Sequence, residues 1–452
     1  MQIQLKKNHG RYAKYKSTGI PWPNEVPEGW DFQRLRFVIQ LNPSKSKVVK
    51  LDENLPVSFI PMEAVSEDGV MQSGEIRPMK EVKEGYTFFQ GNDVLMAKIT
   101  PCFENGKGAV AENLHNNIGF GSTEFLVLRG GNKISPELLW YLISSHWFRS
   151  TGEVEMRGSA GQKRVPERFV KDFLVGLPPK PVQSAIVNYL DEKSLLIERI
   201  IEAKQKQIEL LKEKRSALIN RAVTQGIDED VEMKDSGVEW IGKVPIHWEV
   251  TRMRYLAKKI NSGVTPKGGA ESYIDEGIPL IRSLNVYSDG FRWEDLAFID
   301  RRIYESMSNS QLQIDDVLLN ITGASIGRSY YFSGEFPEAN VNQHVCILRL
   351  KKSVLTKFIH YFLISKSGQE QIDLVQMGTS REGLNYQQIR NFDITVPPNL
   401  DQQKIVEYLE KEMRKIDIAL QKIQQSIDLL REYKTSLVAS VVTGKVKLTV
   451  NP

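Results

Sequence analysis

Residues 16–36 read KSTGIPWPNEVPEGWDFQRLR, and residues 234–254 read KDSGVEWIGKVPIHWEVTRMR. Aligned without a gap, these stretches place Gly19, Trp22, Val26, Pro27, Trp30, Arg34 and Arg36 on Gly237, Trp240, Val244, Pro245, Trp248, Arg252 and Arg254. A second match follows downstream, where LPPKPVQSAIVNYLDEKSLLIERI from Leu177 is echoed by VPPNLDQQKIVEYLEKEMRKIDIA from Val396. Because the two matches have nearly the same offset, the chain consists of two homologous halves. A period this long excludes a solenoid and indicates one module duplicated and fused, which predicts pseudo-two-fold symmetry.

The composition is typical of a globular protein. A chain of 452 residues predicts two to four domains, and 41% hydrophobic and 26% charged residues are ordinary values. The net charge of +4 fits a polyanionic partner only if the positive charge is clustered. Cys102 and Cys346 lie in opposite halves without metal-like spacing, which excludes a disulfide framework and favours a reducing cytoplasm. There is no signal-peptide pattern and no apolar run near the roughly 18 residues of a membrane span, so we expect a cytoplasmic protein without membrane association.

Each half alternates short strand-like runs with turns. VSFIPM, DVLMAKI and EFLVLRG in the first half correspond to IPLIRSL, DVLLNIT and VCILRL in the second, and all are rich in strand-forming residues. An amphipathic helix follows (ELLWYLISSHWF or KFIHYFLISKSG), then a polar loop and a final strand that ends in a double proline. We therefore expect an α+β chain with two homologous mixed α/β domains over residues 1–179 and 228–398.

Each double proline precedes a long segment with heptad spacing, which predicts helices over residues 180–227 and 399–446 and leaves a short tail at 447–452. The expected seam consists of Ile186, Leu190, Ile197, Ile200, Ile208, Leu211, Leu218, Ile405, Leu409, Ile416, Ile423, Ile427, Leu430 and Leu437. About 40 residues at 1.5 Å each make a rod of roughly 60 Å, far longer than a domain of this size needs for its own packing. We expect the two rods to pack on each other, against the alternative of two separate core helices.

Charges at the seam leave the direction of packing open. Antiparallel packing sets Arg215 near Glu412 but Lys193 near Lys434, whereas parallel packing sets Lys193 near Glu412 but Arg215 near Lys434. Each arrangement therefore has one attractive and one repulsive contact.

Motifs for catalysis are absent from the sequence. There is no P-loop, no HExxH, no GxSxG and no Asn-Pro-Pro-aromatic methylation motif. The six histidines are scattered without ligand spacing, and the acidic residues Glu104 and Glu124 have no second carboxylate at a defined spacing. We therefore expect no catalytic residue, no metal site and no cofactor in this chain.

Polar and basic loops recur at corresponding places in the two halves and make up the candidate DNA-binding set. Its first-half members are Lys98, Thr100, Asn105, Lys107, Arg157, Ser159, Lys163 and Arg164, and its second-half members are Asn320, Thr322, Ser325, Arg328, Thr379, Ser380, Arg381 and Asn385. These residue types supply the donors and acceptors that proteins use on base edges and phosphates. The alternative is that they are ordinary solvated turns, but their recurrence before each long helix favours a surface that reads a polymer.

At these residues the chain resembles the specificity subunits of type I restriction–modification systems. The resemblance covers essentially the whole length, through SGVEWIGKVPIHWEV, STEFLVLR, NQHVCILRL, GLNYQQIRNF and the PPxxxQxxIVxYL helix starts. It implies that each domain is a target recognition domain for one half of an asymmetric, bipartite site in double-stranded DNA, and that the helices form an antiparallel coiled coil that sets the spacer.

The resemblance also implies partners. Two modification (methyltransferase) subunits would dock on the helices and carry S-adenosylmethionine, and restriction subunits would complete the cleaving complex. Two other functions stay open from the sequence: a non-enzymatic coiled-coil scaffold with protein-binding globules, and the recognition component of a single-chain restriction–methylation enzyme, for which 452 residues leave no room for a methylase domain.

Overall fold

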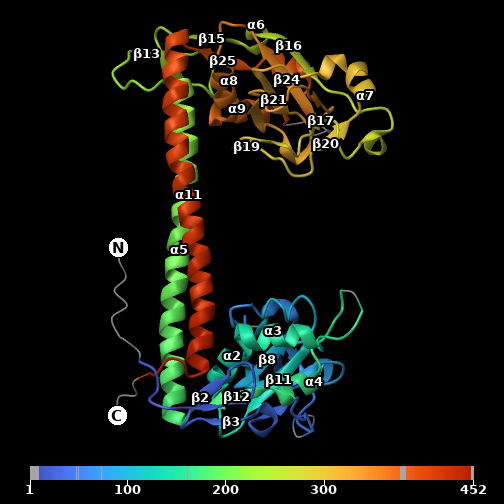
Figure 1. The fold of residues 1–452 in the computed structure, drawn as a ribbon, viewed down its shortest axis with the longest axis vertical. Helices are drawn as coiled ribbons and strands as arrows, with labels where there is room; N and C mark the ends of the chain where they lie inside the picture. The colour runs from blue at the N-terminus through green and yellow to red at the C-terminus, as the bar shows by residue number, and fades with distance from the viewer. Residues whose placement is uncertain are drawn as a thin grey trace. The chain divides into compact units, whose positions relative to one another are not determined.

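The computed structural model describes residues 10–46, 48, 50–72, 74–159, 161–376 and 383–448. The chain divides into two compact units (Figure 1). The first unit comprises residues 1–203 and 425–452, and the second comprises residues 204–424. Each unit therefore contains one β-rich domain, called here the first or second domain, together with a piece of each long helix.

The first domain is built on two four-stranded sheets, with strand orders β4-β11-β8-β9 and β6-β5-β10-β7. The pair β1-β2 forms within the opening segment, and the pair β3-β12 joins the opening and closing segments. Its strands are β1 (Tyr15–Ser17), β2 (Glu25–Pro27), β3 (Asp31–Arg34), β4 (Ile39–Leu41), β5 (Pro56–Ile60), β6 (Glu75–Pro78), β7 (Thr87–Gln90), β8 (Asp93–Ala97), β9 (Gly108–Val110), β10 (Ile118–Gly121), β11 (Phe125–Gly130) and β12 (Leu174–Leu177). Its helices are α1 (Met79–Val82), α2 (Pro136–Ser144), α3 (His146–Glu155) and α4 (Glu167–Asp172).

The second domain repeats this plan with sheets ordered β16-β24-β21-β22 and β20-β17-β23, and with pairs β13-β14, β15-β25 and β18-β19. Its strands are β13 (Met233–Asp235), β14 (Lys243–Pro245), β15 (Glu249–Arg252), β16 (Ala257–Ser262), β17 (Ile278–Ile281), β18 (Val286–Tyr287), β19 (Gly290–Phe291), β20 (Ala297–Ile299), β21 (Asp316–Asn320), β22 (Ser329–Tyr331), β23 (Asn340–Val341), β24 (Val345–Leu350) and β25 (Asp393–Val396). Its helices are α6 (Met253–Leu256), α7 (Arg301–Ser306), α8 (Thr356–Ile364), α9 (Lys366–Gln376) and α10 (Tyr386–Arg390).

A buried ion pair crosses the central strands of each domain. Arg129 on β11 donates from Nε and Nη2 to the two carboxylate oxygens of Asp93 on β8, both at 2.6 Å. Arg349 on β24 makes the same paired contact with Asp316 on β21, both at 2.8 Å. The aspartate side chains are 1% and 0% exposed, so each charge depends on its arginine, and the pair holds the register of the two strands.

The long helices α5 (Lys180–Thr224) and α11 (Asn399–Val442) pack antiparallel within each unit (Figure 1). In the first unit, the start of α5 enters the same core as the end of α11, through Ile186 and Val441. In the second unit, the end of α5 and the start of α11 share a core through Val223 and Ile405. This arrangement is possible only if the helices run in opposite directions, as the resemblance implied.

The ion pairs between the helices differ from those expected for antiparallel packing. Arg215 pairs with Asp417, whereas Glu412 bonds to Lys415 on its own helix. Lys434 reaches Glu198 at 2.7 Å. Every residue of the expected seam is buried or half-buried, whereas other apolar residues of the helices, such as Leu210 and Leu429, stay exposed. The apolar spacing therefore predicts which residues form the seam, but not which charged residues pair beside it.

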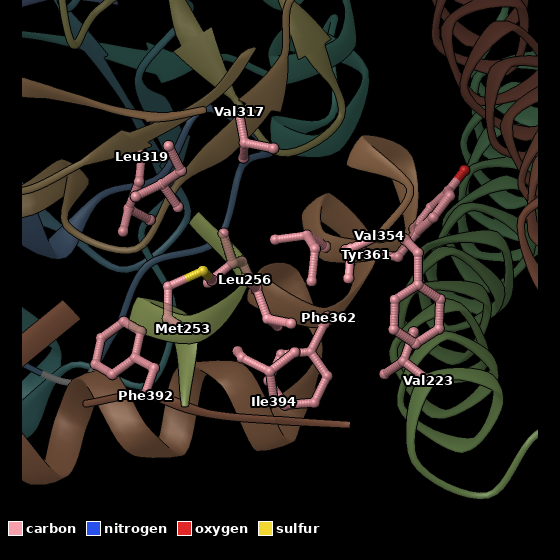
Figure 2. Close-up of a cluster of buried hydrophobic side chains, with 14 of the residues drawn as sticks. Val223, Met253, Leu256, Val317, Leu319, Val354, Tyr361, Phe362, Phe392 and Ile394 are labelled. Carbon is pink, nitrogen blue, oxygen red and sulfur yellow. The ribbon is translucent and has the colours of Figure 1, made fainter. Parts of the chain in front are cut away.

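Each domain closes its core against a long helix. In the second unit, Val223 of α5 and Phe362 of α8 belong to one buried cluster with Met253 of α6 and Ile394 of β25 (Figure 2). Burial of such side chains contributes about 1.5–3 kcal/mol each. The long helices are therefore part of the interior of each unit and not an appended spacer.

A buried glutamine ties the start of each long helix to its domain. Gln183 donates to the carbonyl oxygens of Lys133 and Pro178 and accepts from the Ser135 amide, at 2.7, 2.9 and 3.1 Å. Gln402, the matching residue, makes the same three bonds. It donates to the carbonyl oxygens of Ser353 and Pro397 and accepts from the Leu355 amide. Gln402 is 0% exposed and Gln183 is 2% exposed. The side chain satisfies backbone groups that the turn into the helix would leave unpaired.

No helix in the described part of the chain has the length and apolarity to cross a membrane.

Candidate nucleic-acid interface

The structure brings together the two polar loops that the sequence singles out in the first domain. The first loop spans residues 98–107 between β8 and β9, and the second spans residues 157–165 before α4. Thr100 ties them together, because its hydroxyl donates to the Gly161 carbonyl oxygen and accepts from the Lys163 amide, both at 3.1 Å. The Thr100 amide also donates to the Lys163 carbonyl oxygen at 3.0 Å. The two loops therefore form one continuous surface.

Arg164 is the most constrained cation of this surface. Its Nε and Nη2 donate to both carboxylate oxygens of Glu124, at 2.9 and 2.8 Å. These hydrogen bonds lower the pKa of Glu124 below its ordinary value. Lys163 and Arg157 are exposed and make no ion pair within the described residues, so their charge is available to a ligand.

The remaining first-domain candidates lie on the same two loops. Asn105 and Ser159 are exposed, and Lys98 and Lys107 are half-buried. Exposed amide and hydroxyl groups at such places can donate to or accept from a polar polymer.

Arg149 on α3 joins the candidates, although the sequence did not reveal it. Its guanidinium lies against Gly106, where a side-chain carbon would collide with Nη1. Burial lowers the pKa of Arg149, and its Nε has no hydrogen-bond partner among the described residues. The matching residue in the second domain is Gln369, which bonds to the carbonyl oxygens of Gly327 and Leu363. The first domain therefore adds a positive charge beside Lys107 where the second domain has a neutral structural contact.

The loops of the second domain are held together by different bonds. Thr322 shares a hydrogen bond with His344 Nδ1 at 2.5 Å and pairs with Gly383 in an isolated β-bridge. The Leu384 amide donates to the Ile321 carbonyl oxygen at 2.8 Å. The loop after β21 therefore meets the segment before α10, as the corresponding loops meet in the first domain.

Two second-domain candidates have structural contacts. Asn320 is 0% exposed, and its Nδ2 donates to the carbonyl oxygens of Ser283 and Val286 at 2.8 and 3.4 Å, so its amide supports the β18–β19 hairpin. Asn385 caps α10 by accepting from the Gln388 amide at 2.9 Å. Of the other candidates in this domain, Ser325 and Arg328 are half-buried, and Thr379, Ser380 and Arg381 lie outside the described residues.

Arg328 lies over the ring of Tyr287, with its guanidinium carbon 4.2 Å from the ring centre, and Arg292 lies 4.5 Å from the same centre. Neither Tyr287 nor Arg292 was identified from the sequence. The available signal was the run YSDGFR, in which two residues separate short strands with aromatic and basic side chains.

Comparison with known proteins shows what this chain resembles. The family model for the type I restriction modification DNA specificity domain matches residues 245–428. Over these residues the chain is similar to type I specificity subunits. The EcoEI specificity subunit of Escherichia coli is 40% identical over 184 residues, which cover 39% of this chain and 30% of that relative. The MjaVIII specificity subunit of Methanocaldococcus jannaschii is 23% identical over 427 residues and covers 94% of each chain.

A solved chain from a type I R-M system has the same fold as this chain. The two are 18% identical with a TM-score of 0.72, and the match covers 93% of this chain and 99% of the other. By contrast, the match with the EcoEI specificity subunit spans less than a third of that relative's length.

No cluster of metal-ligating side chains occurs among the residues that the structure describes.

Proposed function

We propose that this chain is the DNA-reading subunit of a type I restriction–modification complex. Each domain would read one half of an asymmetric, bipartite target in double-stranded DNA. The observation that carries the proposal is that two domains with the same plan carry different polar side chains at equivalent positions. Lys107 stands where the second domain has Arg328, and Arg149 stands where it has Gln369. Different donors on matching loops suit two different half-sites.

The long helices would set the distance between the half-sites and dock two modification subunits, which carry S-adenosylmethionine, while restriction subunits complete the complex. Support for a fixed spacing comes from the way both helices are built into the cores of the two units. The chain itself would perform no chemistry, since the sequence contains no methylation, nuclease or nucleotide-binding motif.

Methylation mapping tests this proposal. The chain is co-expressed with a type I modification subunit, and modified bases are mapped along the host DNA. We expect modification only when both proteins are present, at two short fixed sequences separated by a spacer of constant length. Modification that does not depend on this chain, or that follows one uninterrupted motif, contradicts the proposal. An assembled complex that binds no DNA would instead favour a protein-binding scaffold.

A further inference from the structure

The β18–β19 hairpin of the second domain has a rigid base. Val286 is fully buried in the domain core, and Phe291 packs against the same cluster. Asn285 is also fully buried, and its Nδ2 donates to the carbonyl oxygen of Arg292 at 3.0 Å. The Arg292 amide donates back to the Asn285 carbonyl oxygen at 2.9 Å, and Asn320 donates to the carbonyl oxygens of Ser283 and Val286. Side chains on this hairpin are therefore held in place before any ligand arrives.

Two arginines share one aromatic ring on this hairpin, but only one of them is neutralised. Arg292 donates from Nη2 to both carboxylate oxygens of Asp289, at 2.7 and 2.9 Å. Arg328, which enters from the loop before β22, makes no ion pair with any described residue. Its guanidinium is stacked on Tyr287 and keeps its planar fork of N–H donors for an external acceptor. Stacking also reduces the side-chain entropy that binding would otherwise cost.

Resting on the proposed function, we propose that Arg328, stacked on Tyr287, reads a guanine in the half-site of the second domain. A planar fork of donors matches the O6 and N7 acceptors of guanine in the major groove, the commonest specific arginine contact in protein–DNA complexes. A two-stranded β-ribbon fits that groove. Arg292 keeps the ring in place, and its own charge is already balanced by Asp289.

The first domain has the matching hairpin without this chemistry. An isolated bridge between Val65 and Met71 closes it, and Asp68-Gly69 stands where the second domain has Asp289-Gly290. Ser66 replaces Tyr287, Met71 replaces Arg292, and Lys107 replaces Arg328. Asp68 also lies 3.8 Å from Lys434 of α11 in the same unit. The guanine contact therefore belongs to one half-site only.

Binding of the assembled complex to labelled duplexes tests the inference. The duplexes carry the mapped target with each base pair of both half-sites replaced in turn, and binding is measured at two salt concentrations. For Arg328→Ala we expect the preference for one G·C pair in one half-site to fall roughly ten- to hundredfold, with the other half-site unchanged. Arg328→Lys keeps the charge but loses the fork, so it should lose the same preference while retaining most of the affinity. Tyr287→Leu should weaken the preference, and Tyr287→Phe should retain it.

Arg302 on α7 is the matched control, because it is an exposed arginine of the same domain without an ion pair among the described residues. Arg302→Ala should leave the preference unchanged. Arg328→Ala that weakens binding equally on all sequences, with a smaller salt dependence, would identify a phosphate contact and overturn the guanine contact. Unchanged binding on every duplex would overturn it too. If the complex without any substitution shows no preference for a bipartite target, the proposed function fails, independently of Arg328.

Discussion

Glu124 and His344 occupy matching positions directly before β11 and β24, but they hold their neighbouring loops by different chemistry. Glu124 accepts two hydrogen bonds from Arg164 of the following loop, whereas His344 bonds to Thr322 of the preceding loop and to Gln343. At the other end of the same strands, the Arg–Asp pair is retained in both domains. An unpaired buried charge costs several kcal/mol, whereas an exposed ion pair contributes about 0–1 kcal/mol. Duplication has therefore preserved the buried pair and left the loop contacts free to diverge.

The largest expected effect comes from breaking the retained pair. Arg349→Ala leaves the Asp316 carboxylate buried without its partner and should destabilise the second domain by about 3–5 kcal/mol. Arg129→Ala should have a similar effect on the first domain, because the geometry is the same. Urea unfolding with hydrogen exchange resolved by domain measures both changes. A loss below about 1 kcal/mol in both domains would contradict the role of the pair, and such a small loss in one domain only would show that the two pairs are not equivalent.

The glutamines at the helix starts should give an intermediate effect. Gln402→Ala leaves the Leu355 amide and two carbonyl oxygens without their partner, which should cost about 1–3 kcal/mol, and Gln183→Ala should cost a similar amount. Gln403→Ala is the matched control for the second unit, since Gln403 is the exposed neighbour on the same helix. Hydrogen exchange at the start of α5 and α11 reports the change. Equal effects of Gln402→Ala and Gln403→Ala would refute the role of the buried amide.

The diverged contact at Glu124 should give the smallest effect and depend on pH. Because Arg164 lowers the pKa of Glu124 in the folded protein, the contact stabilises above the unfolded-state pKa of about 4.3 and is lost as pH falls through the lower folded-state value. Glu124→Gln should lower the Tm by less than about 2 °C near neutral pH, with the difference disappearing in acid. Glu104→Gln, at an exposed residue of the same domain, should show no such difference. A difference that grows in acid would contradict the assigned sign.

The duplicated fold and the helix seam could be predicted from the sequence because both are repeating patterns. The direction of helix packing could not, because the charges considered balance, and the observed partners are Asp417 for Arg215 and Glu198 for Lys434. These partners depend on a register that the apolar spacing does not define. Only the resemblance to a known family indicated the antiparallel arrangement.

The candidate interface could be predicted in part. Thr100 and Lys163 belong to loops whose composition is visible in the sequence, and the structure brings those loops together. Composition did not show that Asn320 points inward, because a polar residue at a strand end can face either side of the sheet. The stacking of Arg328 on Tyr287 joins residues on separate strands, so no local pattern could reveal it.

The sharing of helix segments between the units has a consequence for the order in which the protein folds on the ribosome. The second unit is one continuous stretch, residues 204–424, but the first unit needs residues 425–452 as well. Until those residues emerge, the core of the first unit lacks Val438, Val441 and Val442. At about 5–20 residues per second, the first domain would wait for roughly tens of seconds after its own synthesis. The half that is translated first is therefore the half that is completed last.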